Sequence, residues 1–469
     1  MCAGFYTGLM QRSVVITGLG VVSAAGVGAG ALWELLESGR SAVGPVEAFD
    51  ASGLPCRLAG EVSGVRARDY VPKSYRKATK VMARDTQLAV VAAQLAIADA
   101  GLATRGSGEA SASATADDAP RLDPQRTGCQ IGAGLLTAEI DELTAALDTS
   151  RDESGAFDVR RWGGADDVPG AGSAMDNLPP LWMLKYLPNM PACHVTIIHG
   201  AEGPSNTITC AEASGLLSLG ESARVIERGD ADACFSGGVE SKINPLGMVR
   251  LWFEGRLAEA DASVEASGVV RPYDPDAPGG LPGEGGAIMM LEDAAKVSGR
   301  RVYAEIAGFG AAHSAPPLFP GVFDDEPGPD AADEGVRRAV LSAMDDAGVG
   351  PGEIDAIVPG AMGVPAVDRG EQNALAAVFG DRLGEIETIT ITPAIGMTAA
   401  GHGSLLAAAG ALAISRQRLP ARVHGGTPAG PMRAGAVPAR DADLRTVLVC
   451  TPSLGGQVGA LVLRRPGMA

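Results

Sequence analysis

Residues 203–238 read GPSNTITCAEASGLLSLGESARVIERGDADACFSGG, and this stretch decides the fold class. It opens as a strand that runs directly into a helix, whose apolar residues from Leu216 to Ile226 recur on one face. Gly229 ends that helix, and residues 231–238 form a second buried strand. A strand, a helix and a further strand in this order indicate an α/β fold.

The alternation of strand and helix runs through the whole chain and restarts after Arg300. Two consecutive sets of about five strands with intervening helices predict a duplicated α/β unit. Polar, Gly-rich stretches near 103–120 and 150–175 interrupt the first set, and we expect surface insertions there. In the second set, strands are expected at residues 302–306, 354–358, 388–392, 446–450 and 460–463.

Composition and charge exclude several classes of function. The 469 residues carry a net charge of −18, and such a surface repels nucleic acid and anionic membranes. The chain has no apolar run of about 18 residues and no positive charge before Arg12, which argues against a membrane span and a signal peptide. Seven cysteines without a C-x-x-C pair favour free thiols, so we expect a cytoplasmic protein.

Several short stretches together carry a family resemblance. In order, they are VVITGLGVVSAAG at 14–26, LPNM at 187–190, RGDAD at 228–232, GEG at 283–285 and GG at 455–456. Their order and spacing resemble the β-ketoacyl synthases over nearly the whole chain, from Arg12 to Arg465. The resemblance implies a thiolase-like duplicated fold with five layers, αβαβα. It also implies two ketosynthase-like halves, at 12–297 and 300–466.

The position of the family's nucleophile can be found by counting. The family places its nucleophilic cysteine where a strand meets a helix, eight residues after a Gly-Pro proline and eight before a helical glycine. Counting from Pro204 and from Gly220 gives the same position, which is Glu212. Because a carboxylate cannot replace a thiolate in taking an acyl group from a thioester, the resemblance implies that the nucleophile is missing.

The family's two catalytic histidines can be located in the same way. The first opens a run that here extends from Gly360 to Glu371, so Gly360 takes its place. Counting back from Pro420 without gaps puts the second histidine at Met397 and the family's lysine at Thr392. The family's imidazoles decarboxylate the malonyl unit and stabilise its enolate, which glycine and methionine cannot do. We therefore expect no catalytic residue at these degenerate positions.

This triple loss is similar to the chain-length factors, the KSβ subunits of type II polyketide synthases, in which Gln commonly replaces the cysteine. The resemblance implies a non-catalytic subunit that pairs with a catalytic KSα as a heterodimer and shapes the acyl tunnel. Such a subunit needs no cofactor or metal of its own, because the partner receives acyl groups from a phosphopantetheine-linked acyl carrier protein. The acidic surface agrees with this, since carrier-protein docking would fall to a basic patch on the partner.

Three residues keep an active enzyme open as an alternative. Cys210 lies two residues before Glu212 and would be the nucleophile only if the strand–helix junction slipped against both anchors. Glu212 itself is a candidate general base. His402 resembles the family's Gly-His dipeptide, but it breaks the gap-free count to Pro420, so we interpret it as a helix or loop histidine. The alternatives are an acyltransferase, a decarboxylase or a condensing enzyme, and also a homodimeric scaffold.

Four further polar residues have plain structural interpretations. His194 and His199 form an H-x4-H pair, but no C-x2–4-C pair accompanies them, so we expect no zinc site. Asp368 and Glu371 are expected to be structural partners in a loop rather than acid–base catalysts.

An apolar stretch with Trp182, Met183, Tyr186 and Met190 is unusual in a chain with only 4% aromatic residues. In the family this region lies near the dimer seam and the acyl tunnel. We hypothesise that it helps to shape a pocket that limits chain length. The alternative is ordinary core or interface packing.

Overall fold

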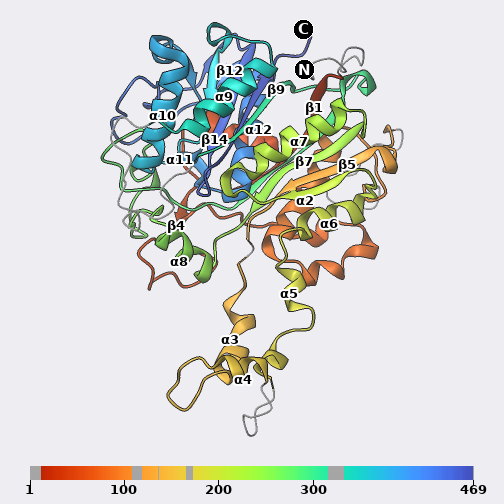
Figure 1. The fold of residues 1–469 in the computed structure, drawn as a ribbon, viewed down its shortest axis with the longest axis vertical. Helices are drawn as coiled ribbons and strands as arrows, with labels where there is room; N and C mark the ends of the chain where they lie inside the picture. Colours follow the sequence, from red (N-terminus) through yellow and green to blue (C-terminus); the bar gives the residue numbers. More distant parts are fainter. Residues whose placement is uncertain (1–11, 108–118, 136, 165–172, 315–331, 468–469) are drawn as a thin grey trace, which may run out of the picture.

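A computed structural model describes residues 12–107, 119–135, 137–164, 173–314 and 332–467. Most of the insertion expected at 103–120 therefore lies outside the described residues. Ten of the strands in this part of the chain follow one path through a mixed sheet, which crosses the centre of the molecule (Figure 1).

The two halves of this sheet have the same topology. The first has the spatial order β1-β8-β7-β5-β6 and the second has β9-β15-β14-β10-β11, so both read 1-5-4-2-3 when numbered along the chain. This repeated order confirms the predicted duplication. The strands are β1 (Val14–Ser23), β5 (Thr127–Gly132), β6 (Ser205–Ile208), β7 (Ala233–Glu240), β8 (Gly285–Asp293), β9 (Ala304–His313), β10 (Ala356–Val358), β11 (Glu387–Thr388), β14 (Thr446–Pro452) and β15 (Gln457–Arg464).

Six helices form three layers around the half-sheets. The outer N-terminal layer, the middle layer and the outer C-terminal layer hold, in that order, α2 (Arg84–Asp99) with α6 (Met190–His199), α7 (Ser214–Glu227) with α12 (His402–Arg416), and α9 (Glu334–Asp346) with α10 (Pro365–Phe379). With the two half-sheets these make five layers. Because α12 packs on both β8 and β14, its apolar sequence has almost no solvent-facing side. Within the described ranges, no helix is both long and apolar enough to cross a membrane.

Shorter elements complete the described chain. They are α1 (Ala29–Ser38), α3 (Ile140–Thr149), α4 (Val159–Gly163), α5 (Trp182–Lys185), α8 (Pro245–Phe253), α11 (Thr392–Ile395), β2 (Gly26–Val27), β3 (Gly44–Pro45), β4 (Leu58–Ala59), β12 (Arg418–Leu419) and β13 (Arg440–Asp441).

One expectation from the sequence is wrong in detail. The strand expected at 388–392 is limited to β11, and Thr392 instead begins α11. The physical reason is Pro393, which cannot donate to a strand ladder but fits the first turn of a helix. The stretch near 150–175, expected to be a surface insertion, is described except for residues 165–172. It contains α4, which begins where the Asp158 side chain accepts a hydrogen bond from the Arg160 N–H.

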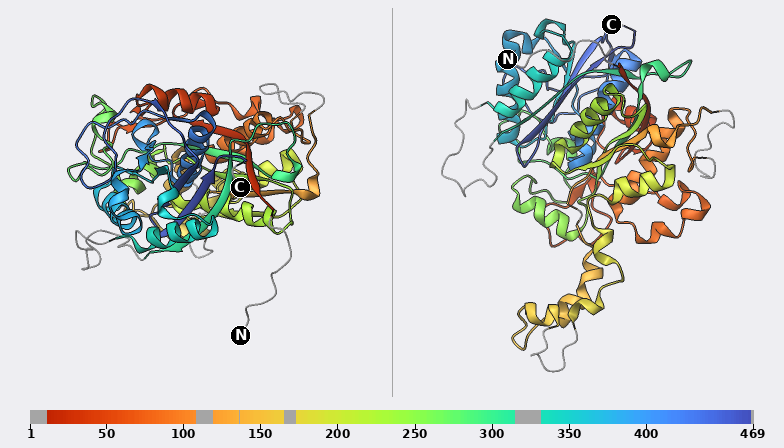
Figure 2. Two further views of the ribbon diagram at one scale, coloured as in Figure 1. Left: turned by 90° about the horizontal axis from the view of Figure 1, so that it is seen from above. Right: turned by 45° about the vertical axis from the view of Figure 1, so that its right-hand side comes forward.

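The helices α3, α4 and α5 project from the body, as both ribbon views show (Figures 1 and 2). We call the described residues 137–164 and 173–187 the arm. The arm leaves several large apolar side chains exposed, a surface that monomeric proteins rarely keep bare. These side chains are Phe157, Val159, Met175, Leu181, Met183 and Leu184.

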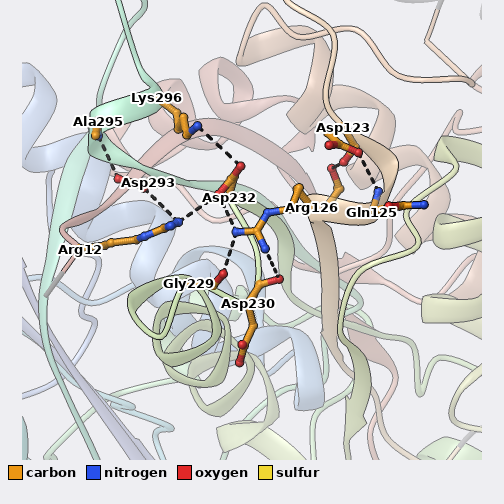
Figure 3. Close-up of polar contacts among 11 residues, drawn as sticks. Arg12, Asp123, Gln125, Arg126, Gly229, Asp230, Asp232, Asp293, Ala295 and Lys296 are labelled. Atoms are coloured by element: carbon orange, nitrogen blue, oxygen red, sulfur yellow. Dashed lines mark hydrogen bonds and ion pairs between the residues drawn. The ribbon is translucent and has the colours of Figure 1, made fainter. Parts of the chain in front are cut away.

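A network of charges joins the residues just before β1, β5 and β7 to the end of β8 (Figure 3). Asp232 accepts hydrogen bonds from Arg126 (2.8 Å) and Arg12 (3.0 Å), and Lys296 lies 3.8 Å away. Arg12 also pairs with Asp293 at 3.2 Å. The hydrogen bond from Arg126 is the main cause that lowers the pKa of Asp232. These side chains are partly exposed, so the network adds only modestly to stability.

Candidate functional site

The N-terminal ends of α7 and α12 meet in the middle layer. A Cβ atom on Gly215 would lie 2.7 Å from the backbone nitrogen of Ser404, and one on Gly403 would lie 3.0 Å from the Glu212 carbonyl oxygen. Glycine at both positions therefore permits the close approach of the two helices. This contact brings Glu212 and His402 into one site.

Glu212 lies in a 3-10 turn, Ala211–Ala213, directly before α7. Its side chain is buried, with 6% of the residue exposed. Arg256 Nη1 donates to Oε1 at 2.8 Å, and the Leu454 backbone N–H donates to Oε2 at 3.0 Å. Because Arg256 is buried as well, this is a buried ion pair in which each carboxylate oxygen has a partner.

Cys210 lies before this turn, where its backbone N–H donates to Ser214 Oγ at 2.8 Å. Burial raises the pKa of its thiol. A thiol with a raised pKa carries little thiolate at neutral pH, so Cys210 is not activated as a nucleophile. Burial also raises the thiol pKa of Cys56, Cys129, Cys234 and Cys450.

The carbonyl oxygen of Gly360 joins two of the candidate residues. Thr392 Oγ1 and His402 Nε2 both lie 3.1 Å from this oxygen. A carbonyl oxygen only accepts hydrogen bonds, so Nε2 carries a hydrogen, and in the neutral imidazole Nδ1 then has none. His402 is fully buried and its Nδ1 has no hydrogen-bond partner. Burial lowers the pKa of His402, and the nearby Glu212 carboxylate acts in the opposite direction.

Position 360 has little room for a side chain. A Cβ atom there would lie 3.0 Å from Thr451 Oγ1, 3.1 Å from Pro452 Cδ and 3.2 Å from Glu371 Oε1. These distances are shorter than ordinary van der Waals contacts, so the three neighbours would have to shift. The neighbours of Gly360 therefore leave no space for a side chain at this position unless they move.

Two buried carboxylates hold the loop that begins at Gly360. Glu371 accepts from the backbone N–H groups of Gly360 (2.8 Å) and Ala361 (3.1 Å) and from the Tyr273 hydroxyl (2.8 Å). Asp368 accepts from the backbone N–H groups that follow, at positions 362 and 363, and from that of Tyr273. Burial raises the pKa of each carboxyl to about 7. Asp368 and Glu371 are structural partners, as the sequence predicts, but they lie on α10 rather than in a loop.

Met397 does not join this group of residues. Its backbone pairs with that of Leu281 and Gly283, and its side chain lies over Gly280 in a separate apolar cluster. His402 lies beside Gly360, where the gap-free count predicted Met397. The prediction for His402 is thus correct about its element, because it begins α12, and wrong about its place. A 3-10 turn, residues 399–401, separates the two positions.

Three alanines around the site have left-handed backbone angles. The φ values are 45° for Ala211, 46° for Ala361 and 44° for Ala399. Each such residue costs of order 1 kcal/mol or more, and strained residues of this kind gather at functional sites. Ala211 and Ala399 hold equivalent places in the two halves, since each begins the 3-10 turn before a middle-layer helix.

His194 and His199 have separate partners. His194 Nδ1 lies 2.8 Å from the Tyr75 hydroxyl, and His199 Nδ1 lies 2.8 Å from Thr104 Oγ1. Burial lowers the pKa of His199 to about 3, which keeps its imidazole neutral. In the part of the chain that the structure describes, no group of three or more acidic, His or Cys side chains could hold a metal ion.

The apolar stretch predicted to shape a pocket lies at the arm and its base. Trp182 and Tyr186 pack together, with 5.6 Å between ring centroids, while Met183 is 61% exposed. Met190 begins α6 on the body. Of these four residues, Tyr186 lines a cavity, at the base of the arm.

Residues 11–296 match the Beta-ketoacyl synthase, N-terminal domain, and residues 303–425 match the corresponding C-terminal domain. The chain belongs to the β-ketoacyl synthase family. The resemblance predicted from short motifs is thereby confirmed, and with it the thiolase-like fold.

Two β-ketoacyl synthase relatives come from Streptomyces. The chain is 32% identical to the tetracenomycin polyketide synthase ketoacyl synthase beta subunit of Streptomyces glaucescens, over 97% of this chain and 98% of that protein. It is also 32% identical to the actinorhodin polyketide putative beta-ketoacyl synthase 2 of Streptomyces coelicolor, over 78% of each. A solved structure, the ishigamide ketosynthase/chain length factor, is 26% identical with a TM-score of 0.77, covering 97% of this chain and 100% of that chain.

Proposed function

We propose that this chain is the non-catalytic subunit of a type II polyketide synthase, a chain-length factor that pairs with a catalytic ketosynthase. The observation that carries the proposal is the environment of Glu212. Its carboxylate stands at the start of α7, where the family has a nucleophile, and is fully engaged by Arg256 and Leu454. A group that is bound on both oxygens by hydrogen-bond donors is a poor nucleophile and a poor base.

Two surfaces support pairing with a second ketosynthase-like chain. Strand β6 is the last strand of its half-sheet, and Ser205 and Asn206 on it are exposed, so its outer edge is open to another strand. The exposed apolar side chains of the arm form the second surface. In this proposal the partner supplies the thiol and receives acyl groups from the phosphopantetheine-linked acyl carrier protein, and this chain holds no cofactor. Trp182, Met183, Tyr186 and Met190 would then help to wall the shared tunnel.

The test compares the purified chain with its complex with the catalytic ketosynthase of the same organism. Each sample is incubated with a malonyl-loaded carrier protein and an acyl thioester, and intact masses and products are recorded. We expect no product and no acyl adduct from the chain alone. In the complex, the adduct should appear only on the partner and should vanish when the partner's nucleophilic cysteine is replaced by alanine. An acyl mass on this chain, at Cys210 or elsewhere, contradicts the proposal.

One observation favours a second candidate, a malonyl thioester decarboxylase. His402 presents an uncharged, unpartnered Nδ1 within the site, and decarboxylation to carbon dioxide and an acetyl thioester needs no thiol. The chain alone would then release carbon dioxide from malonyl carrier protein, and His402→Ala would abolish that release. Absence of release by the unmodified chain removes this candidate.

A further inference from the structure

A cavity of about 390 Å³ opens where the arm joins the body. Tyr186 and Glu139 from the arm line one side, and loops and helices of the body line the rest. The charged side chains on its wall are five carboxylates and one guanidinium, namely Glu47, Glu61, Asp85, Glu139, Glu284 and Arg84.

Arg84, the one cation among the described residues of the wall, is already paired. Arg84 Nη2 donates to Glu284 Oε1 at 2.7 Å, and Arg84 Nε donates to Glu284 Oε2 at 3.1 Å. This bidentate pair leaves the other four acidic side chains without a cation among the described residues of the wall. The cavity therefore holds more acidic groups than its described lining can pair.

Asp85 is the carboxylate with the greatest need for a partner. Only 4% of the residue is exposed, and its Oδ1 accepts a hydrogen bond from the Ser241 backbone N–H at 3.0 Å. Its Oδ2 is buried and has no hydrogen-bond partner among the described residues. Lys242, whose charge lowers the pKa of Asp85, is itself paired with Glu240 and also donates to a backbone carbonyl. Burial and the neighbouring Glu240 raise the pKa of Asp85 to about 8.

We propose that this cavity receives the ammonium or guanidinium group of a Lys or Arg side chain from the partner subunit, with Asp85 Oδ2 as its acceptor. The inference rests on the proposed function, because it names how the partner is recognised. Two features favour a side chain of the partner over a free cation. The cavity is continuous with the arm, whose apolar side chains need a cover. Phe49, Val62 and Ile243 line the cavity beside the carboxylates. They can pack against the methylene stem of a long basic residue while its charged head reaches Asp85.

The test measures the dissociation constant of the heterodimer formed from the two purified subunits, at 50 and 500 mM salt. The variants are Asp85→Asn, which keeps the Oδ1 acceptor, and Glu61→Gln at the rim of the cavity. Glu385→Gln on the C-terminal half is the matched control, because it makes the same carboxyl-to-amide change in an exposed side chain. We expect Asp85→Asn to weaken assembly about tenfold or more with reduced dependence on salt, Glu61→Gln to weaken it less, and the control to leave it unchanged.

Two outcomes overturn the inference, and they differ from failure of the proposed function. An Asp85→Asn chain that folds and assembles with unchanged affinity and salt dependence shows that no partner cation reaches Asp85. Titration with methylguanidinium, with acetamide as the neutral control, gives a second readout by thermal stabilisation. If methylguanidinium stabilises the unmodified chain and not Asp85→Asn while assembly is unaffected, the cavity binds free cations only. If the unmodified chain forms no heterodimer at all, the proposed function is wrong. The inference that a partner side chain supplies the cation is then wrong as well.

Discussion

Glu212 and Asp85 are both buried carboxylates near the start of a helix, yet their surroundings are opposite. Each oxygen of Glu212 has a donor, and one donor is the cation of Arg256. Asp85 has a single backbone donor and the like charge of Glu240 nearby. The comparison shows that burial alone does not define the role of an acidic residue. A carboxyl group whose oxygens all have donors in its own chain has no acceptor left for another molecule. A carboxyl group with an unpaired oxygen can still accept a donor from outside the chain.

The largest expected effect comes from a substitution of Glu212, the carboxylate whose two oxygens both have donors. Glu212→Leu leaves Arg256 buried without a counter-charge, and we expect a loss of about 3–5 kcal/mol in the free energy of unfolding. Urea denaturation of the purified chain measures it. The double variant Glu212→Leu/Arg256→Met removes both charges and should recover most of the loss. A single variant that loses less than about 1 kcal/mol would show that the ion pair does not hold the site together.

A second variant examines a buried carboxylate whose partners are all neutral. Glu371→Gln removes one of the two oxygens that accept from the backbone N–H groups of Gly360 and Ala361 and from Tyr273. A buried donor left unpaired costs about 1–3 kcal/mol, so we expect a loss in that range. Hydrogen exchange at Gly360 and Ala361 should accelerate, and the control Glu353→Gln, at an exposed capping position, should leave those amides unchanged.

Asp85, the carboxyl group with one unpaired oxygen, predicts an unusual dependence of the free energy of unfolding on pH. The folded pKa of Asp85, about 8, lies above its unfolded value, so its contribution to stability is present in acid and is lost as pH rises toward 8. Asp85→Asn cannot ionise. Relative to the unmodified chain it should gain about 1–2 kcal/mol between pH 6 and pH 8, measured by denaturation at both pH values. If the difference stays constant with pH, Asp85 is already ionised in the folded chain at pH 6.

The smallest effect is expected at a carboxylate that is only partly buried. Asp232 has two arginine partners, but more than a quarter of its side chain is exposed. Asp232→Asn should cost less than about 1 kcal/mol, because solvent screens such pairs. The cost should shrink further in 0.5 M salt. A loss as large as that of Glu212→Leu would mean that exposure does not separate these classes of ion pair.

The sequence predicts the duplicated fold and the place of Glu212, because both depend on local patterns. Glu212 follows from two counts to nearby anchors, and the structure puts it in the turn before α7. His402 was considered and set aside because the count from Pro420 allowed no extra turn, whereas the chain forms one at 399–401. The available signal was Gly401-His402 at the start of an Ala- and Leu-rich helix. The cavity at Asp85 depends on contacts between distant segments, which no local pattern encodes.

The duplicated topology also has a consequence for how the protein is made. The middle helices α7 and α12 each pack against both half-sheets, and β15 touches α7 as well as α12. During synthesis α7 leaves the ribosome before the strands of the second half-sheet are made. Its apolar face therefore stays uncovered while more than two hundred further residues are added, up to β15. Such a nascent intermediate is prone to aggregate. Closure of the core therefore depends on β15, which is translated after the other described strands of this sheet, and chaperone binding to the nascent chain should end when β15 docks.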